Sequence, residues 1–238
     1  DYKTAYTLLK EYHPYNKKSD LKVTPEGISN SKIRLEVANG KINLFCGKKV
    51  YDNFIEFVRF NDKGDTYNYA PDRKDKGEYA KITDAYVISD GPLRAEIKII
   101  TSFFGINVFI NKLSNLINFK IEWNNLLPNK LWQVRFNFNK PVKETYSEDM
   151  NILIKRKFDS EYDIRRHLPK TRGKEVKTNT APMQRFVWAN GCGFITKGLT
   201  EYEVFENSLS ITLLRSIGII SNPQNPARTT PAGPPIKV

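Results

Sequence analysis

The clearest pattern in the chain is an alternation of apolar and polar residues that reverses at a turn. Within residues 33–37, isoleucine, leucine and valine alternate with charged residues, and a period of two is that of a β-strand. Asn39-Gly40 follows, a pair that accepts the positive φ angles of a two-residue hairpin turn. The alternation resumes at Ile42 and Leu44. This region therefore predicts a β-hairpin.

A second alternation is longer and predicts a strand with one buried face and one solvent-exposed face. Its apolar members are Trp132, Val134, Phe136 and Phe138, and its polar members are Gln133, Arg135, Asn137 and Asn139. Further strand-like runs lie at residues 54–60, 80–88, 93–101, 106–110, 119–123, 152–158, 185–189, 194–196, 202–205 and 210–214. Many short strands with turn residues between them, and little helical periodicity, predict an all-β antiparallel sandwich.

The ends of the chain differ from this pattern. Residues 1–14 carry Ala5, Leu8, Leu9 and Tyr12 at helical spacing, and Pro14 ends that face. Residues 15–27 are polar and charged, so residues 1–27 are predicted to be a linker or short helical arm, and residues 28–238 the β-domain. Residues 159–180 are predicted to be a long charged surface excursion, and the proline-rich residues 222–235 to be extended.

Charge raises the question of a nucleic-acid partner. The formal net charge is +12, and a basic chain can bind phosphates. The lysines and arginines are scattered, however, and basic groups such as Lys155-Arg156-Lys157 have acidic residues close by. No zinc-finger spacing, helix-turn-helix pattern or RNA-binding motif is present. A solvated basic surface is therefore favoured over a nucleic-acid site.

Cysteine content and hydropathy provide evidence on the cellular location of the protein. Cys46 and Cys192 are too few for a disulfide framework and lie in apolar runs, so both are predicted to be buried free thiols. The sequence has no run of about 18 apolar residues of the kind that spans a membrane, and no Asn-x-Ser/Thr sequon. A bacterial-type cytoplasm is the expected location, with no membrane partner.

The segment Gly64–Pro71 interrupts a strand-like region with a glycine, a carboxylate, two tyrosines and a proline. That composition is typical of a rigid loop that presents polar groups at the rim of a sheet. Residues 64–68, Gly-Asp-Thr-Tyr-Asn, resemble the Gly-Asp-x-Tyr-Asn motif of glycoside hydrolase family 38, the α-mannosidases.

Other stretches extend this resemblance in the family's order. They are Asp90–Arg94, Pro182–Val187, Gly198–Val204, Ile211–Gly218, Arg228 and Ala232–Pro235. Over Ile28–Pro235 the chain is similar to the C-terminal β-domain of the family. The resemblance implies a large antiparallel supersandwich of the galactose-mutarotase-like type. The family's domain usually continues beyond the last Gly-Pro-Pro, so residues 28–238 are expected to be an incomplete sandwich.

The resemblance also implies a role. In the family, a separate N-terminal domain holds zinc and the aspartate nucleophile, and this chain has only His13 and His167, neither in a metal-ligand spacing. No pair of carboxylates about 5 Å apart, as a retaining glycosidase needs, is identified. The chain is therefore expected to be a non-catalytic portion that completes the cleft for an α-mannoside against that zinc-dependent domain. Whether it is itself an enzyme, and whether it forms a homo-oligomer, is left open.

Four residues are candidates for sugar contact, and no residue is proposed to be catalytic or to bind a metal. By the family motif, Tyr67 resembles a tyrosine that reaches the sugar, because a phenol offers both a ring face and a hydroxyl. Asp65 and Asn68 share its loop, where holding backbone amides is the favoured alternative role for Asp65. Arg185 lies in a stretch that borders the same cleft in the family, with a salt bridge as the alternative.

Several other residues are expected to be structural. Tyr69 is predicted to pack and Arg215 to anchor a strand end. Glu201 and Glu203 share one strand face and are predicted to be exposed rather than catalytic. The three tryptophans, Trp123, Trp132 and Trp188, are predicted to belong to the core.

The sequence is also compatible with two other functions. A stand-alone carbohydrate-binding module would use Tyr67 without any catalytic partner. A nucleic-acid binder would use the basic surface, and its affinity would fall steeply as salt rises.

Overall fold

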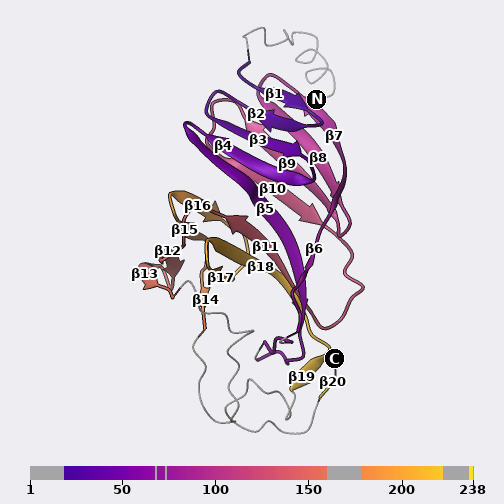
Figure 1. Cartoon of the computed structure of the whole chain (residues 1–238), viewed down its shortest axis with the longest axis vertical. Helices are drawn as coiled ribbons and strands as arrows, with labels where there is room; N and C mark the ends of the chain where they lie inside the picture. Colours follow the sequence, from indigo (N-terminus) through magenta and orange to yellow (C-terminus); the bar gives the residue numbers. More distant parts are fainter. Residues whose placement is uncertain (1–18, 68, 73, 160–177, 222–235, 238) are drawn as a thin grey trace, which may run out of the picture.

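The chain is built almost entirely of antiparallel strands in the computed structural model (Figure 1). The structure describes residues 19–67, 69–72, 74–159, 178–221 and 236–237. Within these ranges there are twenty strands and no helix, and each strand pair is antiparallel. The predicted all-β antiparallel supersandwich is therefore confirmed. No helix of the described residues has the length and hydropathy needed to cross a bilayer.

Ten strands form the large sheet. They are β1 (Lys22–Thr24), β2 (Gly27–Ser29), β3 (Ile33–Ala38), β4 (Lys41–Cys46), β5 (Lys49–Asn61), β6 (Glu78–Tyr79), β11 (Lys130–Asn137), β14 (Thr180–Pro182), β17 (Glu201–Phe205) and β18 (Ser208–Ser216). Their order is β1-β2-β3-β4-β5-β11-β18-β17-β14, and β6 pairs with β5. The thirteen-residue β5 joins the early strands to the late ones.

Two four-stranded sheets and one strand pair complete the fold. One sheet has the order β10-β9-β8-β7, from β7 (Ile82–Asp90), β8 (Arg94–Thr101), β9 (Gly105–Asn111) and β10 (Ile117–Glu122). The other has the order β13-β12-β15-β16, from β12 (Glu144–Asp149), β13 (Ile152–Lys157), β15 (Phe186–Ala189) and β16 (Cys192–Ile195). β19 (Ile219–Ser221) pairs with β20 (Ile236–Lys237).

Both four-stranded sheets pack on the same face of the large sheet. The apolar side chains of β11 mark this face: Trp132 lies against Phe104 of the β8–β9 turn, with ring centroids 6.3 Å apart. Phe136 lies against Phe194 of β16, at 4.2 Å. One continuous core therefore fills the space between the large sheet and both smaller sheets. Close packing of such a core is the main stabilising term.

The opposite face of the large sheet carries a smaller apolar cluster. Val58, Phe60 and Leu131 are buried there, and Tyr69 packs against them. Gly77 approaches closely: a Cβ at this position would lie 2.6 Å from the Phe60 ring and 2.8 Å from a Val58 methyl group. This cluster supports the loop that follows β5.

The predicted hairpin at Asn39-Gly40 is confirmed. β3 and β4 pair from Ile33↔Cys46 to Ala38↔Lys41, and both turn residues have positive φ, 53° and 73°. The large sheet begins earlier than predicted, because Lys22–Thr24 of the expected linker form β1 and pair with β2. The expected helical face of residues 1–14 and the proline-rich residues 222–235 lie outside the described residues.

Several predictions about burial are wrong. Gln133 was predicted to be wet, yet it is 1% exposed and donates from Nε2 to the Glu203 carboxylate at 3.0 Å. Cys46 is exposed and Cys192 is only partly buried, although both are free thiols. Trp188 is 41% exposed rather than part of the core.

Candidate functional site

The Gly64–Pro71 segment forms the tip and one side of a closed loop that directly follows β5. Asp62 and Pro71 form an isolated bridge at its base. The Lys63 amide donates to the Ala70 carbonyl at 2.9 Å. The segment is a loop, as its glycine, aspartate and proline content predicted, and the structure adds that the loop starts and ends at the same point of the sheet.

A buried carboxylate organises the inside of the loop. The Asp62 side chain is fully buried, and its Oδ1 accepts the backbone amides of Gly64 at 2.9 Å and Ala70 at 3.1 Å. Its Oδ2 accepts from Nε and Nη2 of Arg215, at 2.9 and 2.7 Å. Both oxygens are therefore satisfied, which makes burial of this charge tolerable.

Arg215 connects the loop to β18. Besides Asp62, its Nη2 donates to the Asp65 carbonyl at 3.0 Å, and its guanidinium lies 5.9 Å from the ring centre of Tyr69. The prediction that Arg215 anchors a strand end is confirmed, and the structure adds that it fixes the loop as well. Tyr69 packs, as predicted.

Asp65 and Thr66 set the conformation of the tip. Asp65 is fully buried, and its Oδ1 accepts the Tyr67 backbone amide at 3.0 Å. Thr66 donates from Oγ1 to the carbonyl of Ile220 at 2.7 Å, so β19 holds the tip from the other side. In this arrangement the Asp65 carboxylate shapes the loop, which is the alternative role that the sequence favoured for it.

Tyr67 lies at the exposed end of this network. Its side chain is 67% exposed, while its backbone amide is held by Asp65. An exposed phenol on a fixed backbone can present a ring face and a hydroxyl to a ligand. Asn68, the other candidate of the loop, lies outside the described residues.

Arg185 belongs to a different sheet from the loop. It precedes β15 and donates from Nε and Nη2 to the carboxylate of Glu148 on β12. Glu148 is buried, whereas the Arg185 side chain is 73% exposed. The guanidinium holds the pKa of Glu148 below its usual value, and the carboxylate raises the pKa of Arg185. The salt bridge that was the alternative role for Arg185 is therefore present.

The strand glutamates are not both exposed, so that prediction is wrong for Glu203. Glu203 is 5% exposed and accepts from Gln133, and Glu201 accepts from the Thr212 hydroxyl at 2.8 Å. The Gln133–Glu203 bond links β11 to β17 across the intervening β18, and the Thr212–Glu201 bond links the neighbouring strands β18 and β17. Sequence reasoning also missed Asp62 and Glu148, since nothing in their local pattern distinguishes them from surface carboxylates.

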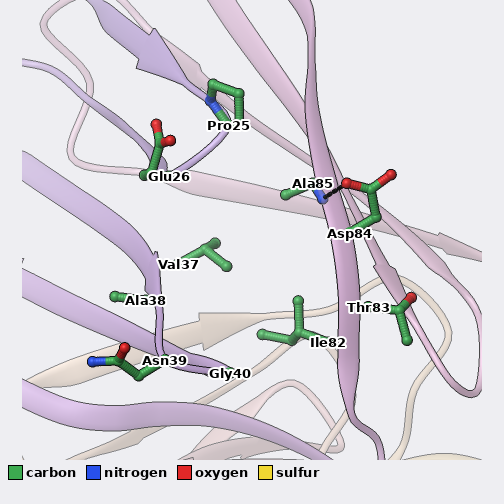
Figure 2. A pocket seen from close by; sticks show the side chains of 10 residues that line it. All are labelled: Pro25, Glu26, Val37, Ala38, Asn39, Gly40, Ile82, Thr83, Asp84 and Ala85. Atoms are coloured by element: carbon green, nitrogen blue, oxygen red, sulfur yellow. Dashed lines mark hydrogen bonds between the residues drawn. The ribbon is translucent and has the colours of Figure 1, made fainter.

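A cavity of about 260 Å³ lies away from the loop. It is lined by the β1–β2 turn, the β3–β4 turn and the start of β7, and Figure 2 shows Glu26 and Asp84 on opposite sides of it. Thr24 lowers the pKa of Glu26 by a hydrogen bond. In Figure 1 these turns lie at the end of the molecule opposite β19 and β20, next to which the loop is held.

The donor set for a zinc ion is not assembled in the described part of the chain. Among these residues, no three His, Cys, Asp or Glu side chains gather as a metal site would require. The described residues therefore form no zinc site of their own, and the resemblance assigns the zinc to a separate N-terminal domain.

Comparison with known proteins adds evidence on the fold. No family model matches the sequence, and no curated protein matches it. The structure superimposes on an alpha-mannosidase from Enterococcus faecalis V583 with a TM-score of 0.71, at 17% identity, over 87% of this chain and 28% of that one. A family 38 glycosyl hydrolase from Enterococcus faecalis gives 0.71 at 16%, over 90% and 29%.

The chain has the fold of one part of these family 38 glycoside hydrolase structures. It spans less than a third of their length, so the match concerns only one part of each of those proteins. At this identity the likeness establishes the fold, and the activity of the whole enzyme does not transfer with it.

Proposed function

We propose that the chain is the non-catalytic β-sandwich portion of an α-mannosidase-like glycoside hydrolase. In this role it packs against a zinc-dependent catalytic domain of the same enzyme and completes the sugar cleft at their junction, a common place for ligand sites. The proposal is supported by the fold shared with one part of two family 38 structures. The observation that carries it within this chain is the position of Tyr67 on its fixed loop.

Tyr67 is the residue proposed to meet the α-mannoside. Its ring covers one face of the pyranose, and its hydroxyl exchanges a hydrogen bond with a sugar hydroxyl. The network of Asp62, Asp65 and Arg215 fixes the backbone around it before any ligand arrives. Such preorganisation reduces the entropy that binding would otherwise cost.

The zinc and the catalytic carboxylates belong, in this proposal, to polypeptide outside this chain. When bound there, zinc contributes Lewis-acid chemistry and holds the substrate. The part of this chain that the structure describes contributes binding and water exclusion, and no proton transfer is assigned to it. A cytoplasmic location remains a prediction, and whether the chain forms a homo-oligomer remains open.

A turnover assay tests whether this chain lacks catalytic activity on its own. The purified chain is incubated with a chromogenic α-mannoside and zinc, and no turnover above the uncatalysed rate is expected. Turnover at enzyme-like rates would contradict the proposal. The flanking reading frame is the complementary observation: it should encode a His-x-Asp pair and an aspartate nucleophile upstream.

The role of Tyr67 is tested in the enzyme encoded by that longer frame. Tyr67→Ala is expected to lower kcat/KM by about 10- to 100-fold, corresponding to about 1.4–2.8 kcal/mol. Tyr67→Phe should recover the part that comes from the ring. Tyr86→Ala is the matched control, because Tyr86 is a 40% exposed tyrosine on the distant β7. Equal kinetics for Tyr67→Ala and Tyr86→Ala would remove Tyr67 from the cleft.

A further inference from the structure

The sheet β13-β12-β15-β16 turns one face toward solvent and places a tryptophan on it. Trp188 lies between Val187 and Ala189 on β15, and both of these neighbours are fully buried. Alternation along the strand therefore directs Trp188 outward, where it is 41% exposed. An exposed tryptophan at a fixed strand position has no role in the core that the other side of this sheet builds.

The strand register fixes the surroundings of the indole. Tyr146 of β12 lies directly opposite Trp188 on one side, and its ring meets the indole edge to face at 5.6 Å and 70°. Gly193 of β16 lies opposite on the other side. A Cβ at Gly193 would be 3.8 Å from Cδ1 of Trp188, so the glycine leaves uncovered a part of the indole that any other residue would contact.

Charged groups border the two rings. Lys155 of β13 lies opposite Tyr146, stands 5.2 Å from its ring centre and pairs with Glu144 at 2.8 Å. Glu148 lies two residues beyond Tyr146 on the same face, about 7 Å along the strand, and holds the exposed Arg185. The two Arg185 contacts use Nε and one Nη2 hydrogen, which leaves other guanidinium N–H groups directed to solvent.

We propose that this face is a carbohydrate-binding site, separate from the Tyr67 loop, with Trp188 as its stacking platform. The apolar face of a hexopyranose lies on the indole in the space left by Gly193. The exposed Arg185 guanidinium donates to its hydroxyls at one end, with Glu148 holding that guanidinium in place, and the Lys155 ammonium donates at the other end. The site takes a neutral hexopyranoside, because both bordering carboxylates are already paired with cations.

The choice of a sugar over a polypeptide rests on the ring geometry. Exposed aliphatic residues nearby, Leu153 and Ile195, would also suit a protein partner. An apolar protein surface, however, does not require the gap at Gly193 or the paired charges beside the indole. The choice of a hexopyranoside also rests on the proposed function, whereas the site itself is defined by this chain alone.

The test uses the whole chain and methyl α-D-mannopyranoside as the probe. Binding is followed by the indole ¹H–¹⁵N signal of Trp188, which is assigned as the signal that Trp188→Ala removes, because Trp123 is also only partly buried. The Trp188 signal is expected to shift saturably with the mannoside and not with mannitol, an acyclic polyol without a ring face. Polypeptide use of this face would appear instead as self-association that the mannoside does not affect, and would overturn the proposal.

Two variants and one control decide the assignment. Gly193→Val keeps the indole and has room at its Cβ, and it is expected to weaken binding by at least about tenfold, or 1.4 kcal/mol. Trp188→Ala, followed by calorimetry, should abolish binding. Tyr86→Ala, at the exposed tyrosine on β7, is the control and should leave the affinity unchanged. Loss of binding with Tyr67→Ala, and not with Gly193→Val or Trp188→Ala, would overturn this site and leave the proposed function standing. Loss with Gly193→Val and Trp188→Ala, and not with Tyr67→Ala, supports this site independently of the Tyr67 cleft.

Discussion

Arg215 binds Asp62 across 153 positions of sequence, and this ion pair fixes the loop that carries Tyr67. Both partners lie away from solvent: the Asp62 side chain is fully buried and that of Arg215 is 20% exposed. The remaining Asp62 oxygen holds two backbone amides of the loop. The pair therefore determines the shape of the loop as well as its attachment to β18.

Arg215→Ala should be strongly destabilising. It leaves a buried carboxylate without its cation, and such a change typically costs about 3–5 kcal/mol. The free energy of unfolding is measured by urea denaturation. Lys63→Ala is the matched control in the same loop, because the Lys63–Asp72 pair is exposed and should contribute less than about 1 kcal/mol. Similar small losses for both variants would show that the Asp62–Arg215 pair does not hold the loop.

Gly77→Ala should destabilise the cluster beneath the loop. Gly77 has φ 79°, and an added Cβ would overlap Phe60 and Val58. Backbone strain and overpacking together should cost about 2–4 kcal/mol in the free energy of unfolding. Gly198→Ala is the control: φ is 83°, but no atom lies within 4 Å of its added Cβ, so only about 1 kcal/mol of backbone strain is expected. Equal losses would contradict the close approach at Gly77.

The Glu148–Arg185 pair should make stability depend on pH. Arg185 lowers the pKa of Glu148 below its ordinary 4.5. The pair therefore contributes stability above about pH 4.5, and this contribution is lost as the pH falls through the lower pKa of the folded state. Denaturation between about pH 3 and 6 should show a shallower decline for Arg185→Ala than for the wild type. Lys41→Ala, at an exposed pair with Asp52, should leave the slope unchanged, and an unchanged slope for Arg185→Ala would refute the prediction.

The two thiols should react at different rates. Cys46 is exposed, whereas partial burial raises the pKa of Cys192, and the thiolate is the reactive form. A disulfide reagent such as DTNB at pH 8 should give a fast phase and a phase at least about tenfold slower. Cys46→Ser should remove the fast phase, and Cys192→Ser the slow one. A single rate for both thiols would contradict the assignment.

Local pattern predicts most strands but not the ones with polar inner faces. The hairpin at Asn39-Gly40 follows from its turn residues and its period of two. β12 was not predicted, because Thr145 and Ser147 occupy its buried positions and no apolar alternation marks it. Gln133 and Glu203 were expected to be wet for the same reason: their burial depends on each other, across two different strands.

The candidate site divides in the same way. Glycine, aspartate and proline in residues 64–71 predict a loop, and the exposed position of Tyr67 agrees with it. The partner of Asp62 could not be read from its neighbours, because it lies on β18. Trp188 shows a second limit of sequence-based prediction. The alternation of residues indicates which side chains share a face of the sheet, but it does not indicate which face stays exposed to solvent.

The contacts that hold the Tyr67 loop also have a consequence for biosynthesis. Its anchors, Arg215 and Ile220, leave the ribosome some 150 residues after Asp62 and Thr66. During translation the loop is therefore synthesised well before β18 and β19, the strands that hold it. A truncated product that ends before residue 215 would keep the early hairpins and lack the shaped tip, so the tyrosine is presented only by a chain whose synthesis has passed that point.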